Sequence, residues 1–339
     1  MTTGLVLGKF APLHKGHQFL IETAVQENDR VIVLIYDAPE VTSIPLPVRA
    51  NWIRTLHPSV EVQEAWDGPR EVGNTAAIRK RHEAYLLKRL QGEEITAFYS
   101  SEFYGTHVSA ALSALDRRLD PDRQRFPISA TAIRQDSYVH RQYLDPLVYR
   151  DLITKVVFLG APSTGKTTLA RELATLHHTT WMPEYGREYW ENHQCDRRLT
   201  PLQLVEIAVG HRDREEICFQ EARERIFIDT DATTTFMFSQ YYHGRAEPQL
   251  AELAAATRNR YDLFFLCAAD IPYDDTWDRS GDAQRQVFQQ QITADLLERR
   301  IPFITLTGSL QNRMQVVTAV LRNFDRFRSL ADQLRVQGL

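Results

Sequence analysis

The sequence has few cysteines and no long hydrophobic run. Its three cysteines, Cys195, Cys218 and Cys267, lie far apart, and no two of them form a CxxC pattern. This spacing excludes a disulfide scaffold and is typical of thiols in a reducing compartment. The longest apolar runs, "VIVLIY" and "LFFLCAA", have the length of strands and are too short to span a bilayer. Because the N-terminus also lacks the pattern of a signal peptide, we expect a cytoplasmic protein.

The sequence also lacks an excess of charge of one sign. Its 40 basic and 44 acidic residues leave a net charge of −4, so neither a nucleic-acid partner nor a membrane surface is expected. Any anion site must therefore be built locally. Hydrophobic residues make up 43% and charged residues 25%, which are ordinary values for a soluble globular protein. A length of 339 residues favours two domains.

Short apolar runs alternate with segments of helical spacing along the whole chain. Strands are predicted at 5–8, 30–37, 60–66 and 95–101, and helices at 17–27, 46–56 and 75–91. After a polar break at 115–127, five more strands are predicted at 155–160, 179–184, 225–231, 263–269 and 302–308. The helices expected there are 166–177, 200–224, 231–243, 246–259, 283–299 and 310–326. This alternation predicts an α/β protein with two doubly wound parallel sheets, in domains 1–150 and 151–339.

The most specific motif in the second half is "GAPSTGKT", which fits the P-loop pattern GxxxxGK[ST] between a strand and a helix. Glycines at both ends let the backbone N–H groups point at phosphate oxygens. The lysine can bridge the β- and γ-phosphates, and the threonine that follows can bind Mg²⁺. A chance match to an ordinary strand–helix turn is the alternative. The expected ATP contacts are Gly160, Ser163, Thr164, Gly165, Lys166, Thr167 and Thr168.

Carboxylates follow two other strands of this half. "RIFIDTDATTT" places Asp229 and Asp231 at a strand end, where a carboxylate can hold Mg²⁺ through its waters or contact the substrate. Asp231 can equally well cap the next helix, and we expect a site role for at least one of the two. Glu184, in "MPEYGREYWE", would point into the crevice at the ends of the strands and act as a base on a substrate hydroxyl.

Further charged residues of the second half have a simpler alternative. Arg187 and Glu188 would grip sugar hydroxyls, although a solvated helix start explains Glu188 equally well. The segment "PYDDTWDRSGDAQRQVFQQQI" has the composition of a lid. Arg279 or Arg285 would swing from it onto the transferring phosphoryl group, unless the loop is merely solvated.

The first half begins with the motif "GKFAPLHKGH", in which His14 and His17 form an HxGH pattern within GxFxPxHxGH. The motif resembles the nucleotidylyltransferase superfamily, which transfers AMP or CMP from a triphosphate. Glycines there allow a nucleotide to approach the backbone, and histidines can donate hydrogen bonds to the oxygens around the attacked α-phosphorus. Zinc binding by the two histidines is the alternative, but no third ligand lies nearby. ATP contacts are expected from Gly8, Lys9, Phe10, Lys15 and Gly16.

A second motif, "ISATAIR", resembles the ISxTxxR motif of the same superfamily. Ser129 and Thr131 would cap a helix and bind phosphate oxygens, and Arg134 would reach the β- and γ-phosphates. Taken alone, a serine or threonine before a helix is commonly only a cap. In the expected order and at the expected distance from HxGH, the motif supports a triphosphate site in the first half.

Both motifs together resemble the NadR family, which joins a nicotinamide mononucleotide adenylyltransferase to a ribosylnicotinamide kinase. The resemblance rests on "GKFAPLHKGH", "PVRANWI", "YSSEFYG", "ISATAIR", "GAPSTGKT", "EYGRE" and "IDTDATTT". It implies ATP and Mg²⁺ as cofactors and ribosylnicotinamide, nicotinamide mononucleotide and NAD as partners. Some members begin with a helix-turn-helix domain, and because this chain starts at the catalytic strand, an enzyme without a repressor role is expected.

The resemblance also implies substrate contacts in the first half. Arg49 and Trp52 would lie near the mononucleotide, with Trp52 stacking on the pyridinium ring. A core tryptophan on a helix face is the alternative. Ser101 and Glu102 occupy a strand end where many relatives have a G-x-D ribose contact, and this chain departs from that pattern.

Two other functions remain open at this point. A fusion of phosphopantetheine adenylyltransferase with dephospho-coenzyme A kinase shares both broad signatures, although the "EYGRE" and "IDTDATTT" contexts favour NadR. Alternatively, the P-loop half is a regulatory sensor that binds ATP without transferring a phosphoryl group. The sequence leaves open the oligomeric state, a homo-oligomer included.

Overall fold

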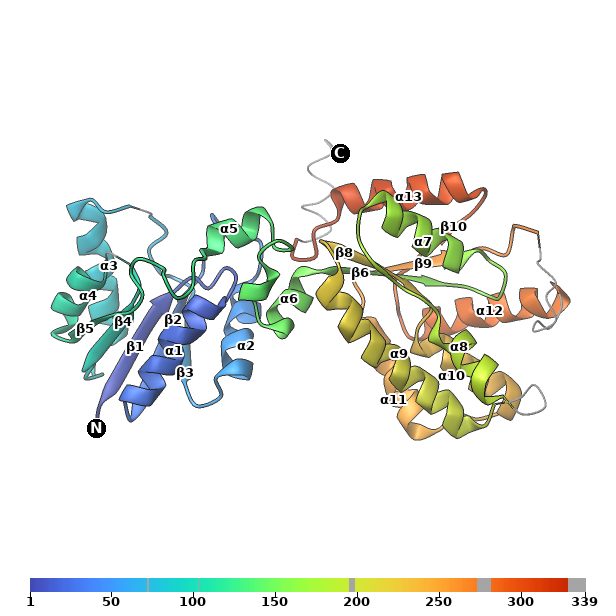
Figure 1. The fold of residues 1–339 in the computed structure, drawn as a ribbon, viewed down its shortest axis with the longest axis horizontal. Helices are drawn as coiled ribbons and strands as arrows, with labels where there is room; N and C mark the ends of the chain where they lie inside the picture. Colours follow the sequence, from blue (N-terminus) through green and yellow to red (C-terminus); the bar gives the residue numbers. More distant parts are fainter. Residues whose placement is uncertain (72, 103, 195–198, 273–281, 329–339) are drawn as a thin grey trace. The chain divides into compact units, whose positions relative to one another are not determined.

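The structure is a computed structural model, and it describes residues 1–71, 73–102, 104–194, 199–272 and 282–328. The chain divides into two compact units, Met1–Tyr149 and Arg150–Leu339. Each unit is built on a parallel sheet of five strands flanked by helices (Figure 1). Two α/β units with parallel sheets confirm the fold class expected from the sequence.

The first unit has the strand order β3-β2-β1-β4-β5. Its strands are β1 (Thr3–Gly8), β2 (Arg30–Tyr36), β3 (Glu61–Ala65), β4 (Ala97–Ser100) and β5 (Leu115–Arg118). Its helices are α1 (Lys15–Glu27), α2 (Leu46–Leu56), α3 (Ala76–Arg89), α4 (Gly105–Leu112) and α5 (Ala130–Gln135). The short helix η1 (Arg141–Tyr143) follows, and α6 (Pro146–Leu152) leads into the second unit.

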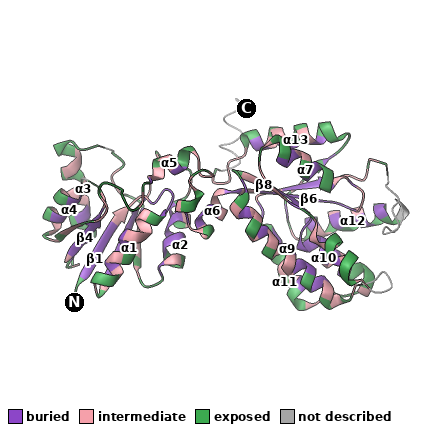
Figure 2. Cartoon of the chain, viewed as in Figure 1, coloured by how far each residue is buried: buried purple, intermediate pink, exposed green. Residues whose placement is uncertain are grey.

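Burial on both faces explains the continuous apolar runs of the central strands. On one face, Leu5 and Ile32 pack with Leu86 of α3 and Val108 of α4. The alternate residues, Val33 among them, are equally buried on the other face, where α1 and α2 contact the strands. Figure 2 shows buried strands under helices whose outer faces are exposed.

The strand β5 was not expected from the sequence, which predicts a polar break from residue 115 onward. Its segment "LDRR" pairs in parallel with β4 at the edge of the sheet. An edge strand has a single neighbour and needs no apolar pattern, and Leu115 is 62% exposed. The strand matters for the site because it brings Arg118 beside the end of β4.

The second unit has the strand order β10-β9-β6-β8-β7. Its strands are β6 (Thr154–Leu159), β7 (Trp181–Met182), β8 (Arg225–Asp229), β9 (Leu263–Cys267) and β10 (Ile304–Leu306). Its helices are α7 (Lys166–Leu176), α8 (Tyr185–His193), α9 (Pro201–Glu221), α10 (Ala232–His243), α11 (Pro248–Ala256), η2 (Thr257–Asn259), α12 (Asp282–Glu298) and α13 (Leu310–Asn323). All five strands lie where the sequence predicts them, although β7 has only two residues.

The order of the strands fixes where ligands can bind. In each unit the first strand along the chain, β1 or β6, lies at the centre of the sheet. The next two strands of the chain are added on one side of it, and the last two on the other side. In open α/β sheets such a switch point forms a crevice at the carboxyl ends of the strands. The two glycine-containing loops follow β1 and β6 and therefore lie in these crevices. Within the described ranges, no helix has both the length and the apolar character needed to cross a membrane.

Candidate functional site

The loop after β1 turns sharply around the ring of Phe10. Phe10 has a φ of 45° and is 1% exposed. A Cβ on Gly8 would lie 3.1 Å from this ring, so the glycine leaves room for the ring to pack closely. The ring also meets His17 edge-on, with 5.0 Å between the ring centroids. Phe10 is thus a packing residue under the loop, which corrects its expected contact with ATP.

The two histidines of the HxGH motif stack on each other at the start of α1. Their ring centroids are 3.7 Å apart, with 21° between the ring planes. Gly16 makes room for this stack, because a Cβ there would lie 3.1 Å from two atoms of the His14 ring. Nδ1 of His14 is buried and has no hydrogen-bond partner among the described residues. Nδ1 of His17 accepts from the backbone N–H of His14 at 3.4 Å, which orients this ring in the stack.

Both histidines are neutral at pH 7 in this structure. Burial, and then the positive charge of Arg123, lowers the pKa of His14 to about 4. Burial also lowers the pKa of His17 well below its usual value, and the charges of His14 and Arg123 add to the effect. Among the described residues, no group of three or more His, Cys, Asp or Glu side chains forms a metal site. The zinc alternative therefore finds no third ligand there.

Arg134 joins the second motif of the first unit to the HxGH loop. Its Nη1 donates to the carbonyl of Ala11 at 2.6 Å, across 123 positions of sequence, and its Nη2 donates to the hydroxyl of Thr131 at 3.0 Å. Ser129 caps α5 by accepting from the N–H of Ala132 at 3.1 Å, as expected. Thr131 lies inside the helix, so its expected capping role is wrong.

Arg49 supports the same loop from the other side. Its guanidinium donates to the carbonyl of Lys9, to that of Tyr36 at 3.0 Å and to that of Ile44 at 3.0 Å. Both Arg49 and Trp52 have 0% exposure. The predicted contacts of these two side chains with a mononucleotide are therefore not supported. Trp52 is a core residue, and Arg49 donates hydrogen bonds to backbone carbonyls.

The two lysines of the loop differ in their surroundings. Nζ of Lys9 lies 2.6 Å from a carboxylate oxygen of Glu40, so its charge is already paired. Lys15 is the first residue of α1 and is exposed. Of the two expected cationic contacts with ATP, Lys15 is the one that faces solvent.

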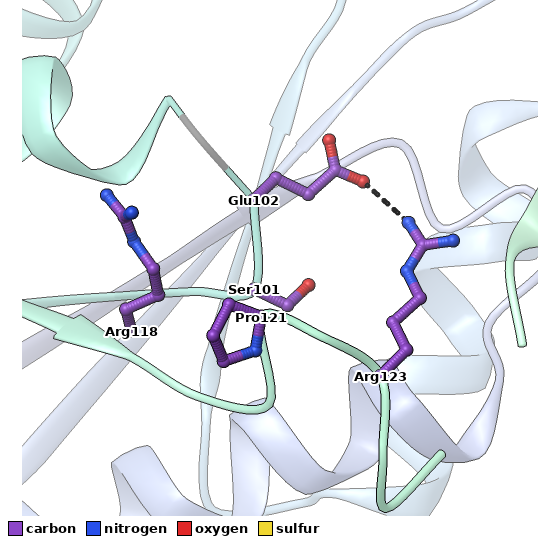
Figure 3. A pocket seen from close by; sticks show the side chains of 5 residues that line it. All are labelled: Ser101, Glu102, Arg118, Pro121 and Arg123. Atoms are coloured by element: carbon purple, nitrogen blue, oxygen red, sulfur yellow. Dashed lines mark hydrogen bonds and ion pairs between the residues drawn. The ribbon is translucent and has the colours of Figure 1, made fainter. Parts of the chain in front are cut away.

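A cavity of about 400 Å³ opens at the carboxyl ends of β4 and β5. It is lined by Ser101, Glu102, Arg118, Pro121 and Arg123. Figure 3 shows the Glu102 carboxylate turned toward the guanidinium of Arg123, 3.3 Å away. Sequence reasoning did not find Arg118 and Arg123, because both lie in the segment interpreted as a polar break. Their only signal was positive charge, which has no motif spacing.

The P-loop of the second unit wraps around the side chain of its own lysine. Nζ of Lys166 donates to the carbonyls of Gly160 at 2.9 Å and Ala161 at 3.0 Å. Gly160 and Gly165 have φ angles of 141° and 82°, which favour glycine. The hydroxyl of Thr164 donates to Ala161 at 2.8 Å and is fully buried, so this side chain holds the loop and does not face a ligand.

Four of the predicted site residues meet at the end of β8. The hydroxyl of Thr167 donates to Oδ2 of Asp229 at 2.5 Å. Burial, and then the negative charge of nearby Glu184, raises the pKa of Asp229 to about 6, while Lys166 opposes this shift. Glu184 itself precedes α8 directly and is half-buried. Lysine, hydroxyl and two carboxylates are therefore gathered beside the P-loop.

This arrangement fits a bound Mg²⁺. The Oδ1 atom of Asp229 is buried without a hydrogen-bond partner among the described residues. A hydroxyl and a carboxylate are hard oxygen donors, which Mg²⁺ prefers, and it usually completes its shell with waters and substrate phosphates. Thr167 and Asp229 would hold the ion in this way.

Other predicted residues of the second unit have different roles. Asp231 caps α10 by accepting from the N–H and hydroxyl of Thr233 at 3.0 and 2.6 Å, which corrects its expected site role. Arg187 is exposed on α8. Glu188 is also exposed and bonds Arg214 at 2.6 and 2.8 Å, in agreement with the alternative of a solvated helix surface.

The residues expected to form a lid are only partly described. Arg279 lies outside the described residues. Arg285 is 3% exposed, and its Nη2 donates to the carbonyls of Ser163 at 3.2 Å and Ile271 at 3.0 Å. Because its guanidinium is buried and bonded to these two carbonyls, Arg285 does not swing as a lid arginine, which corrects the expectation from the sequence. Ser163, with a φ of 59°, lies within the P-loop, and the exposed Thr168 lies in the first turn of α7; their contacts with ATP stay predictions.

The fold and these loops define the class of protein: a nucleotidyltransferase-like domain followed by a P-loop domain. Residues 5–136 match the cytidylyltransferase-like family, and residues 155–313 match an AAA domain family. Both are enzyme-type, nucleotide-binding domains.

Comparisons with whole proteins are more specific. The chain is 28% identical over 329 residues to the trifunctional NAD biosynthesis/regulator protein NadR of Escherichia coli (strain K12), covering 89% of this chain and 78% of the relative. It is 27% identical over 328 residues to the protein of the same name from Salmonella typhimurium, with the same coverage. The resemblance to the NadR family is thus confirmed over nearly the whole chain.

Solved structures of NadR share the fold. A crystal structure of NadR protein in complex with NAD and AMP-PNP matches with a TM-score of 0.55 and 23% identity, covering 95% of each chain. A structure of NadR protein in complex with NR matches equally well. The likeness extends through both units and so supports the order of the two domains.

Proposed function

We propose that this chain is a bifunctional NAD salvage enzyme. The second unit phosphorylates ribosylnicotinamide with ATP, and the first unit transfers an adenylyl group from ATP to nicotinamide mononucleotide. The observation that carries the proposal is the presence of two separate anion-binding loops, each at the switch point of its own sheet and each with polar partners gathered around it. The names of the relatives, which include NAD biosynthesis, and their complexes with NAD, AMP-PNP and NR support the choice of substrates.

In the kinase half, Lys166 releases its backbone carbonyls and contacts the β- and γ-phosphates. Glu184 orients the substrate hydroxyl and accepts its proton as the oxygen attacks the γ-phosphorus. The bond between the γ-phosphorus and the bridging oxygen breaks, and ADP leaves. Thr167 and Asp229 would hold Mg²⁺, which would supply positive charge to neutralise the phosphates.

In the adenylyltransferase half, a phosphate oxygen of the mononucleotide attacks the α-phosphorus of ATP, and pyrophosphate leaves. The neutral rings of His14 and His17 donate hydrogen bonds to the oxygens that gain charge during the attack. Arg134 reaches the β- and γ-phosphates. Glu102 and Arg123 line the cavity beside the histidines and would contact the ribose and a phosphate of the nucleotide.

The order of the reactions is the reverse of the order of the domains. Mononucleotide made in the second unit is the substrate of the first, so a single chain converts ribosylnicotinamide and two molecules of ATP into NAD. Neither step needs a covalent intermediate with the protein, because each is an in-line displacement at phosphorus that depends on position and charge.

The test is to incubate the purified chain with ribosylnicotinamide, ATP and Mg²⁺ and to follow mononucleotide and NAD separately. Both products are expected in succession. Accumulation of mononucleotide without NAD would contradict an active first unit. A parallel incubation with phosphopantetheine and dephospho-coenzyme A examines the related fusion. ATP binding without phosphorylation of any nucleoside would support the sensor instead.

A further inference from the structure

The backbone of the P-loop is bonded to a glutamine far away in the sequence. Oε1 of Gln289, on α12, accepts from the N–H of Ala161 at 2.8 Å, and Nε2 of the same side chain donates to the carbonyl of Cys267 at 3.1 Å. The two bonds connect the beginning of the P-loop to the carboxyl end of β9 through Gln289, which lies 128 positions after Ala161. This N–H group is therefore committed to the protein and does not face a phosphate.

Two arginines hold the middle of the loop. Arg313, on α13, is 2% exposed, and its Nη1 donates to the carbonyl of Thr164 at 2.6 Å. The same guanidinium donates to the carbonyls of Ala268 at 3.2 Å and Gly308 at 3.1 Å, which follow β9 and β10. Arg285, on α12, donates to the neighbouring P-loop carbonyl of Ser163.

We propose that Gln289, Arg285 and Arg313 are positioning residues for ATP in the kinase half. The P-loop contains a non-glycine residue at positive φ, Ser163, between two glycines that also have positive φ. Such a backbone persists only when its surroundings determine it. Guanidinium groups that hold its carbonyls on the side of α12 and α13 leave the remaining N–H groups free to turn toward phosphate.

The choice of arginine at position 313 has a geometric reason. Its guanidinium reaches carbonyls on three segments, after β6, after β9 and after β10, because its donors form a planar fork. An ammonium group on a single stem does not reproduce this geometry. Lysine at this position would therefore keep the positive charge and lose part of the support, which separates the two contributions experimentally.

The proposal rests on the function of the P-loop as a kinase site, and the experiment distinguishes the two. Gln289→Met removes both polar groups at similar volume, and Gln290→Met is the matched control on the exposed side of the same helix. The readouts are KM for ATP and kcat of ribosylnicotinamide phosphorylation. Adenylyl transfer to supplied mononucleotide serves as an internal reference on the same chain.

We expect Gln289→Met to raise KM for ATP about tenfold, because the P-loop loses the bond at Ala161 that fixes its backbone, with kcat changed less than about threefold. Adenylyl transfer and the Gln290→Met control should be unchanged. An unaltered KM for ATP in Gln289→Met would overturn the proposal. A wild-type chain that phosphorylates no ribosylnicotinamide, and whose ATP binding is unaffected by Lys166→Met, would overturn the kinase function itself.

Arg285→Lys and Arg313→Lys keep the proposal testable if Gln289→Met folds poorly. If the two arginines position the loop, KM for ATP should rise in both variants. A higher Mg²⁺ concentration should not reverse this rise in either variant. A fall in kcat of about 100-fold at unchanged KM in Arg285→Lys would instead show that this arginine contacts the transferring phosphoryl group, and would contradict its positioning role.

Discussion

The glycine-containing loops after β1 and β6 use arginine differently. In the first unit, the exposed Arg134 donates to the carbonyl of Ala11 and is also expected to bind phosphates. In the second unit, the buried Arg285 and Arg313 donate to carbonyls of the loop, and Lys166 is the cation expected to contact the ligand. On the proposed function, one exposed residue thus combines support and ligand binding in the first loop, whereas separate residues perform them in the second.

The charge of the two sites differs as well. The first loop presents two neutral, stacked histidines, because burial keeps their pKa values low. The second site gathers a lysine and two carboxylates, and one carboxylate is buried enough that its pKa rises to about 6. On the proposed function, the first site therefore relies on hydrogen-bond donors from the histidines, and the second relies on ionised groups that would hold Mg²⁺.

The largest effect is expected from Asp229→Asn. It removes the charged ligand for Mg²⁺, so ribosylnicotinamide phosphorylation should fall on the order of 100- to 1,000-fold, while adenylyl transfer is unchanged. Initial rates of both reactions on the same preparation measure this. Equal losses in both reactions would show that the two sites are not independent.

The same variant should be more stable than the wild type. The pKa of Asp229 is raised to about 6 in the folded state, so the stability that its protonated form provides at low pH is lost as pH rises from about 4 through 6. At pH 7 an asparagine avoids burying the charge, and the free energy of unfolding should rise by about 1–3 kcal/mol. Denaturant unfolding without nucleotide measures it, and a lower stability at pH 7 would contradict the burial of a charged carboxylate.

Arg134→Met tests the combined role of the exposed arginine. Adenylyl transfer should fall about 100-fold, because the guanidinium stabilises the leaving pyrophosphate, and phosphorylation should be unchanged. Stability should change by less than about 1 kcal/mol, since the side chain is exposed. Gln135→Ala, at the neighbouring exposed position, is the control. A loss of stability without loss of rate would show that Arg134 only supports the loop.

Arg49→Met tests the buried support of the first loop. Three carbonyls lose a charged donor, so the free energy of unfolding should fall by about 2–4 kcal/mol. Adenylyl transfer should fall only about tenfold, because Arg49 acts through the backbone of Lys9 and has no exposed surface. Arg54→Met, on the exposed side of the same helix, should leave both quantities nearly unchanged. A rate loss as large as that of Arg134→Met, without destabilisation, would place Arg49 in contact with substrate.

The smallest change concerns the histidines in the absence of nucleotide. Both rings should remain neutral from pH 8 down to pH 5, with the midpoint for His14 near a pKa of about 4. Side-chain ¹⁵N chemical shifts, with His17→Asn used for assignment, follow each ring through the titration. A midpoint near 6.5 for His14 would mean that its ring is solvated and not held in the stack.

The sequence predicted the central parts of both sites because each is encoded locally. The loops after β1 and β6 contain their glycines, cations and helix starts within ten residues, and Thr167, Asp229 and Glu184 follow strands whose ends meet at one edge of the sheet. Motif spacing and strand order were sufficient to bring them together.

The rest depended on information that residue type does not carry. Arg49 and Trp52 have the chemistry of ligand contacts, but only the packing of α2 shows that they are buried. The sequence allowed Asp231 either to cap a helix or to contact a ligand, and only its bonds to Thr233 identify it as a cap. The edge strand β5 has no apolar pattern. The bonds of Gln289 and Arg313 to the P-loop span 128 and 149 positions without any motif.

The most direct test of two independent sites in one chain is a crossed comparison of Lys166→Met and His17→Ala. The Lys166→Met variant should convert supplied mononucleotide to NAD at the wild-type rate and make no mononucleotide from ribosylnicotinamide. The His17→Ala variant should accumulate mononucleotide from ribosylnicotinamide and form little NAD. Loss of both reactions from either single change would contradict the account.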